Sequence, residues 1–133
     1  MTNIEEQPWL PMLRDALAVL ALPASDQVQV SGPGCLACDL LNDFDNARRA
    51  VIANMPGLPK EQRKLLDRID AAMQAMVPAD FECFNNDVVQ RPAWQQLRGL
   101  AAEALTQFGW ATTEVQPSVE IQPGIWHRPL AGI

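Results

Sequence analysis

Two cysteines three positions apart are the residues of this sequence best suited to chemistry. Cys35 and Cys38 lie in the stretch GPGCLACDLLNDF, where a glycine-rich turn leads into a predicted helix. The dipole and the free backbone N–H groups at a helix N-terminus lower the pKa of a cysteine and favour its thiolate. The motif therefore indicates a redox-active dithiol or half of a metal site. The plain alternative is that two small thiols pack at the start of a core helix.

A third cysteine and the single histidine extend this motif to a candidate zinc site. Cys35, Cys38, Cys83 and His127 together supply the donor atoms of a tetrahedral Cys₃His centre. Cys83 and His127 are isolated in the sequence, so no second pair of closely spaced ligands accompanies the first. Because three cysteines are an odd number, we interpret them as thiols and not as a disulfide framework.

The start of the predicted helix is similar to that of the alkylhydroperoxidase-like fold, an all-helical fold that also begins a helix with CxxC. That family places a histidine just after the second cysteine and a glutamate upstream as a proton relay. Here Asp39, Asn42 and Asp43 follow Cys38 instead. The resemblance implies thiol redox chemistry without that relay, and acids beside a thiol disfavour its thiolate.

Helices must position these residues. Apolar residues recur at helical spacing in four long stretches, at about residues 8–22, 35–55, 59–77 and 92–108. Two shorter helical turns are expected: residues 24–30, for which a short strand is the alternative, and residues 87–90, capped by Asn86 or Asp87. We predict an all-α fold, a single-domain antiparallel bundle of four to five helices.

Helical phase places the cysteines away from the core. Around the 35–55 helix, Cys35 and Cys38 lie about 180° and about 120° from the centre of the apolar stripe. Neither thiol therefore faces the bundle interior. Arg48 lies at the edge of the same stripe, and we expect it to pair with Asp67 or Asp70 of the following helix.

The C-terminal segment changes in character. Prolines and alternating apolar residues predict a bundle domain over residues 1–110 and an extended Pro-rich arm over residues 111–133. The 92–108 helix has a face of small, nearly uncharged residues that includes Gly99 and Ala102. We expect either the arm, docking through Trp126, or the same helix of a second subunit to cover this face.

Composition excludes several classes of function. The 133 residues are 48% hydrophobic, which suits one compact core, and 16 acidic against 10 basic residues give a net charge of -6. Nucleic-acid binding is not expected, because it needs clustered Lys and Arg. An acidic N-terminal stretch and the lack of a long apolar run argue against a signal peptide and a membrane span. We therefore expect a cytoplasmic protein.

The sequence shows no catalytic nucleophile with a partner base. It contains one histidine, no glycine-rich phosphate loop, no G-x-S-x-G and no HExxH. We therefore expect a non-enzymatic, acidic, bacterial-type module without a cofactor that binds a protein partner, for which the net charge favours a basic one. An inhibitor or immunity-like protein is one concrete form. A homodimer through the arm or the last helix is a further expectation. The alternative is a thiol redox or zinc-binding protein that uses Cys35 and Cys38.

Overall fold

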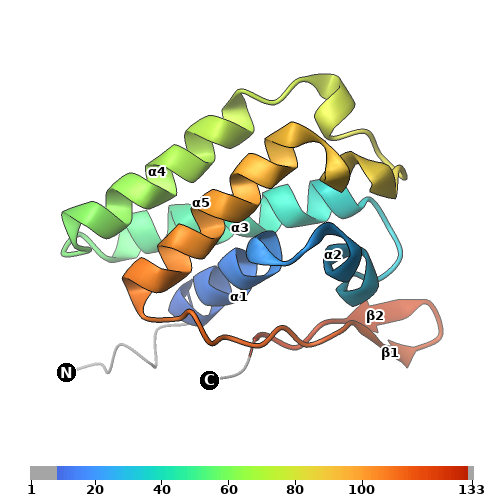
Figure 1. Cartoon of the computed structure of the whole chain (residues 1–133). Helices are drawn as coiled ribbons and strands as arrows, with labels where there is room; N and C mark the ends of the chain where they lie inside the picture. Colours follow the sequence, from blue (N-terminus) through green and yellow to red (C-terminus); the bar gives the residue numbers. More distant parts are fainter. Residues whose placement is uncertain (1–8, 132–133) are drawn as a thin grey trace.

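The computed structural model describes residues 9–131, which form a helical bundle with a small sheet near the C-terminus (Figure 1). The all-α prediction is confirmed in outline, but it missed the sheet. The elements, in chain order, are the helices α1 (Trp9–Ala21), α2 (Ala24–Val30), α3 (Leu36–Asn54) and α4 (Lys60–Gln74), the 3₁₀ helices η2 (Pro78–Asp80) and η3 (Asn86–Gln90), the helix α5 (Pro92–Phe108), and the strands β1 (Val119–Gln122) and β2 (Ile125–His127).

Helix α1 lies at the centre of the bundle. It packs against α3 and α5, and α5 in turn packs against α4. Leu13, Leu17 and Leu20 of α1 are fully buried, as are Phe44 of α3 and Trp94 of α5. Each such side chain contributes about 1.5–3 kcal/mol to folding relative to an exposed one. The core therefore explains why α1 has a nearly continuous apolar sequence.

Segment 24–30 is the helix α2, as expected, and a buried glutamine fixes it. The side chain of Gln27 is fully buried and donates hydrogen bonds of 3.1 Å to the carbonyls of Val19 and Leu20 near the end of α1. Arg98 of α5 donates to the Gln27 side-chain oxygen at 3.2 Å and to the Val89 carbonyl at 2.7 Å. This network holds α2 and η3 at the same end of the bundle.

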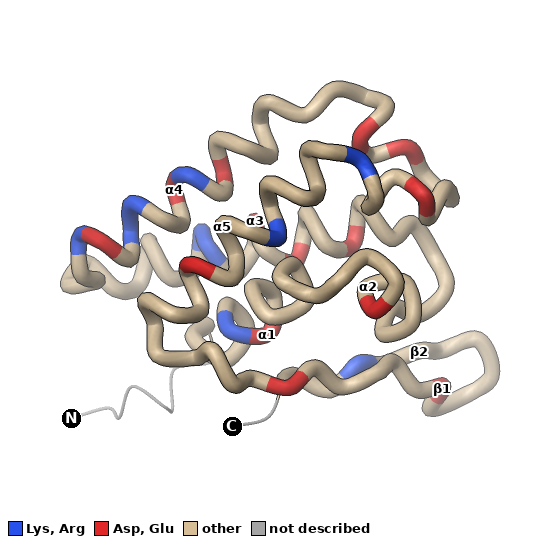
Figure 2. The backbone as a smooth tube through the Cα atoms, in the orientation of Figure 1, with Lys and Arg blue, Asp and Glu red and all other residues tan. Residues whose placement is uncertain are grey.

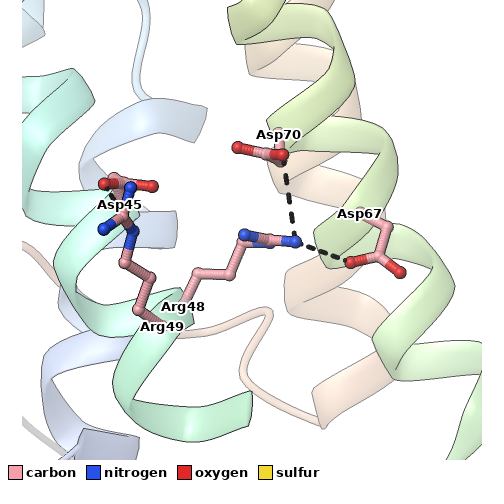
Figure 3. Close-up of polar contacts among 5 residues, drawn as sticks. All are labelled: Asp45, Arg48, Arg49, Asp67 and Asp70. Atoms are coloured by element: carbon pink, nitrogen blue, oxygen red, sulfur yellow. Dashed lines mark hydrogen bonds and ion pairs between the residues drawn. The ribbon is translucent and has the colours of Figure 1, made fainter. Parts of the chain in front are cut away.

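The predicted pairing of Arg48 is also confirmed (Figure 3). Its Nη2 atom lies 2.9 Å from Asp67 Oδ1 and 3.8 Å from Asp70 Oδ2. Arg49, one residue later, pairs instead within α3, where its Nε lies 3.1 Å from Asp45 Oδ2. Arg48 thus links α3 to α4 and fixes their relative register.

The arm is not extended throughout. Strands β1 and β2 form an antiparallel hairpin whose turn contains Pro123 and Gly124, the latter at φ 78°. Proline followed by a glycine of positive φ is typical of a type II turn, and the alternating apolar residues before it are typical of a strand. A bulge interrupts the pairing between Glu120 and Gln122.

The arm packs on α1 and not on the small-residue face of α5. Arg128 forms two hydrogen bonds, of 2.6 and 2.5 Å, with the buried carboxylate of Asp15, and the Ala131 N–H donates to Asp15 Oδ1 at 2.8 Å. Gly99 and Ala102 are exposed, and a Cβ added at Gly99 would meet nothing within 4 Å. The arm of the same chain therefore does not cover that face. It lies on α1 instead, because Arg128 and the Ala131 N–H bind the buried carboxylate of Asp15.

Charged side chains of both signs are interspersed on the surface. Along α4, Lys and Arg alternate with Asp and Glu (Figure 2), and Arg68 lies 3.7 Å from Glu103 of α5. Among residues 9–131, none of the helices combines the length and apolar character that crossing a bilayer requires.

Candidate metal centre

The three cysteines of the chain converge at one end of the bundle. The Sγ atom of Cys35 lies 2.8 Å from that of Cys38 and 3.1 Å from that of Cys83, and the Cys38 and Cys83 sulfurs are 3.5 Å apart. No other His, Cys, Asp or Glu within residues 9–131 joins this group. His127, which the sequence offered as a fourth ligand, lies outside it on β2.

The start of α3 positions two of the sulfurs. Cys35 is the N-cap residue of α3 and has an extended backbone, and Gly34 before it adopts φ 129°, which favours glycine. Leu36 and Ala37 turn into the core, whereas Cys35 and Cys38 are half-buried. The sequence prediction that both thiols lie off the core is confirmed.

A buried aspartate positions the loop that carries Cys83. Asp80 Oδ1 accepts a 2.6 Å hydrogen bond from Arg91 Nε, and its Oδ2 accepts one of 3.0 Å from the Val77 N–H. The Asp80 carbonyl accepts a 2.7 Å hydrogen bond from the indole N–H of Trp94. These contacts fix the beginning of loop 81–85, and nothing in the periodicity of the sequence revealed them.

The other end of loop 81–85 is fixed by η3. The Asn85 side chain accepts a 3.1 Å hydrogen bond from the Asp87 N–H, so Asn85 is the cap and not Asn86 or Asp87 as expected. Val88 and Val89 are buried, and η3 packs against α2, α3 and α5. With both ends anchored, the loop presents Cys83 to the start of α3.

The backbone around the sulfurs favours one thiolate. Burial by itself raises the pKa of Cys35, but hydrogen bonding with the side chains of Cys38 and Cys83 and with the backbone at Cys38 and Phe84 outweighs it, and the net pKa is lowered. Phe84 has a left-handed backbone conformation at φ 61°. Such a conformation in a non-glycine residue costs about 1–3 kcal/mol and clusters at functional sites.

The other two thiols are held protonated. The hydrogen bond to Cys35 raises the pKa of Cys38 to about 12, and the contact with Cys83 and burial act in the same direction. The hydrogen bond to Cys35 likewise raises the pKa of Cys83. Without a metal, loss of a proton is therefore easier at Cys35 than at Cys38 or Cys83.

This donor set suits a soft metal ion. Zn–S bonds of about 2.3 Å in a tetrahedron place two sulfurs about 3.8 Å apart, so the observed sulfurs need only spread by less than about 1 Å. A disulfide, by contrast, needs only two sulfurs at about 2.05 Å. Three sulfurs from two separate segments fit metal coordination, and they also retain the option of forming a disulfide.

The remaining candidate residues lie apart from the sulfurs. Trp126 is on β2, and Gly99 and Ala102 are on α5. Sequence reasoning missed Asp80 and Phe84 as residues that shape the site, although the sequence carries Asp80 next to a proline-containing turn. Comparisons with protein-family models, with curated proteins and with solved structures gave no match for this chain.

Proposed function

We propose that the protein binds a thiophilic metal ion, zinc foremost, at Cys35, Cys38 and Cys83. The observation that carries the proposal is the convergence of Cys83 on the CxxC pair from 45 residues beyond Cys38. Redox exchange between two thiols has no need of a third sulfur at this distance. Soft thiolate ligands select zinc, copper(I) and related ions.

Packing does not account for the convergence. Cys83 is exposed and the other two cysteines are half-buried, whereas the core cluster consists of other side chains. Phe84, next to Cys83, has a left-handed backbone conformation, and its backbone lowers the pKa of the Cys35 thiol. Backbone groups beside ligating sulfurs orient and tune metal ligands in this way.

A bound metal would act as a structural clamp. It would tie the start of α3 to loop 81–85 and would stabilise thiolates at Cys38 and Cys83, whose pKa values are raised in its absence. Ligands must lose their protons, so metal binding releases protons from these thiols and weakens as the pH falls.

Metal analysis and cobalt substitution test this proposal. Protein purified under reducing conditions should bind one zinc per chain, and Co²⁺ in its place should give the sulfur-to-cobalt charge-transfer absorption of a thiolate site. The triple variant Cys35→Ser, Cys38→Ser, Cys83→Ser should give neither. If reduced wild-type protein binds no zinc and gives no such absorption, the proposal is wrong.

The second candidate function is binding of a protein partner, in the form of an acidic module such as an inhibitor or immunity-like protein. Its support is a set of large apolar side chains in the arm that are exposed to solvent, namely Val119, Ile121, Ile125, Trp126 and Leu130. Such a patch often marks an interaction site. Ile125→Ser should abolish capture of a specific partner that wild type and a Met12→Ser control both retain; equal capture by all three proteins would contradict a role for the arm.

A further inference from the structure

Three thiolates leave a zinc ion one ligand short. Structural zinc sites are almost always four-coordinate, whereas the cysteine group contains three sulfurs and no fourth protein donor from residues 9–131. Three thiolates on Zn²⁺ already carry a net charge of −1. A neutral imidazole completes such a site without adding further negative charge, and it is the commonest protein ligand for metals.

The single histidine of the chain is exposed at the same end of the molecule. The hairpin of β1 and β2 lies at the end of the bundle where α3 begins and where loop 81–85 lies (Figure 1). Its Trp126 lies against the turn before Cys35, because a Cβ added at Gly32 would be 3.3 Å from Trp126 Cβ. Successive side chains of a strand point to opposite faces, so His127 faces away from this contact.

We infer that zinc links two copies of this chain, with His127 of the partner subunit as the fourth ligand of each three-cysteine centre. The inference rests on the proposed function. In a two-fold dimer the same patch faces itself, so each subunit gives three sulfurs to one zinc and an imidazole to the other. The dimer therefore holds two zinc ions, each with a Cys₃His ligand set.

The residues around the three cysteines and around His127 suit a protein interface. Phe84, next to Cys83, is 82% exposed, and Ile125 on β2 is 49% exposed. Val119 pairs with His127 across the hairpin and is 47% exposed on the same face. Two copies that each carry a net charge of -6 repel one another, and the zinc–imidazole bonds between the subunits are the contacts that offset this repulsion. Dimerisation is therefore expected to depend on zinc.

The solution mass with and without zinc tests this inference. Wild-type protein should double its mass when one zinc per chain is added and return to a monomer with a chelator. His127→Gln should still bind zinc but remain a monomer. The control Glu120→Gln alters a charged residue of the same hairpin, opposite Trp126, and should dimerise as wild type does.

Mixing two defective variants gives the sharper result. The His127→Gln chain retains the three sulfurs, and the triple cysteine-to-serine chain retains His127; each alone should stay monomeric with zinc. Their mixture should form a heterodimer with one zinc ion. A wild-type monomer that binds one zinc overturns the dimer but leaves metal binding intact, and a wild-type chain that binds no zinc overturns both. A His127→Gln chain that still dimerises with zinc also overturns the inference.

Discussion

The Sγ atoms of Cys35 and Cys83 lie 3.1 Å apart although 48 residues separate them along the chain. A clamp between them restricts the unfolded chain by closing a long loop. By the loop-entropy relation for a cross-link, closing a loop of this length contributes about 4 kcal/mol. Metal binding at this point would therefore couple directly to the stability of the bundle.

The thiol environments predict an order of reactivity in the metal-free protein. The thiolate is the nucleophile, and the pKa of Cys35 is lowered whereas those of Cys38 and Cys83 are raised. Iodoacetamide at neutral pH should therefore label Cys35 first, and peptide mapping by mass spectrometry would show the order. Preferential labelling of Cys83, the most exposed of the three, would mean that access and not hydrogen bonding controls reactivity.

Asp80 is predicted to stabilise the fold at neutral pH. Asp80→Asn removes the carboxylate charge that accepts hydrogen bonds from Arg91 and from the Val77 N–H. We expect this change to lower the free energy of unfolding by about 1–3 kcal/mol. Urea unfolding at pH 7 measures this difference. The exposed Asp87→Asn should leave stability nearly unchanged, and equal stability of both variants would contradict the anchoring role.

The contribution of Asp80 should also depend on pH. The hydrogen bond from Arg91, followed by that from Val77, lowers the pKa of Asp80 below its ordinary 3.8. The folded state thus prefers the carboxylate, so the stabilisation is present above about pH 4 and is lost as the pH falls through the lowered pKa. The difference in unfolding free energy between wild type and Asp80→Asn should shrink below pH 4; a difference that grows there would contradict this sign.

The buried ion pair of the arm gives a fourth prediction. Arg128→Met leaves the buried Asp15 carboxylate with one hydrogen-bond donor among residues 9–131, the Ala131 N–H, and should cost about 3–5 kcal/mol in unfolding free energy. The double variant Asp15→Leu, Arg128→Met removes both charges and should recover much of that loss. Chemical unfolding of wild type, the single variants Arg128→Met and Asp15→Leu, and the double variant measures the cycle; a double variant less stable than Arg128→Met would contradict the explanation.

Much of the helical architecture was predictable from local pattern. Apolar spacing located α1, α3 and α5, and the phase of α3 placed Cys35 and Cys38 off the core. The same phase argument predicted that Arg48 pairs with Asp67 or Asp70, and it lies close to both. These features depend on a repeat of 3.6 residues, which the sequence displays directly.

The positions of loops and arm were not predictable in this way. Cys83 lies beside the CxxC pair because Asp80, three residues before it, accepts hydrogen bonds from Arg91 and Trp94, which follow it in the sequence. The arm lies on α1 because its Arg128 pairs with the buried carboxylate of Asp15. Such contacts join residues far apart in the chain and leave no periodic signal. The hairpin was missed because its prolines favoured an extended arm over paired strands.

Zinc binding by Cys83→Ser, compared with the adjacent control Glu82→Gln, tests the central claim most directly. Binding free energies of structural zinc sites are about 10–16 kcal/mol, so the loss of one of four ligands should cost about 2.5–4 kcal/mol, or roughly 100- to 1,000-fold in affinity. Calorimetric titration of reduced protein should show this loss for Cys83→Ser only, and zinc should raise the melting temperature of Cys83→Ser less than that of wild type and Glu82→Gln. Equal zinc affinity in all three proteins would contradict the three-cysteine metal centre.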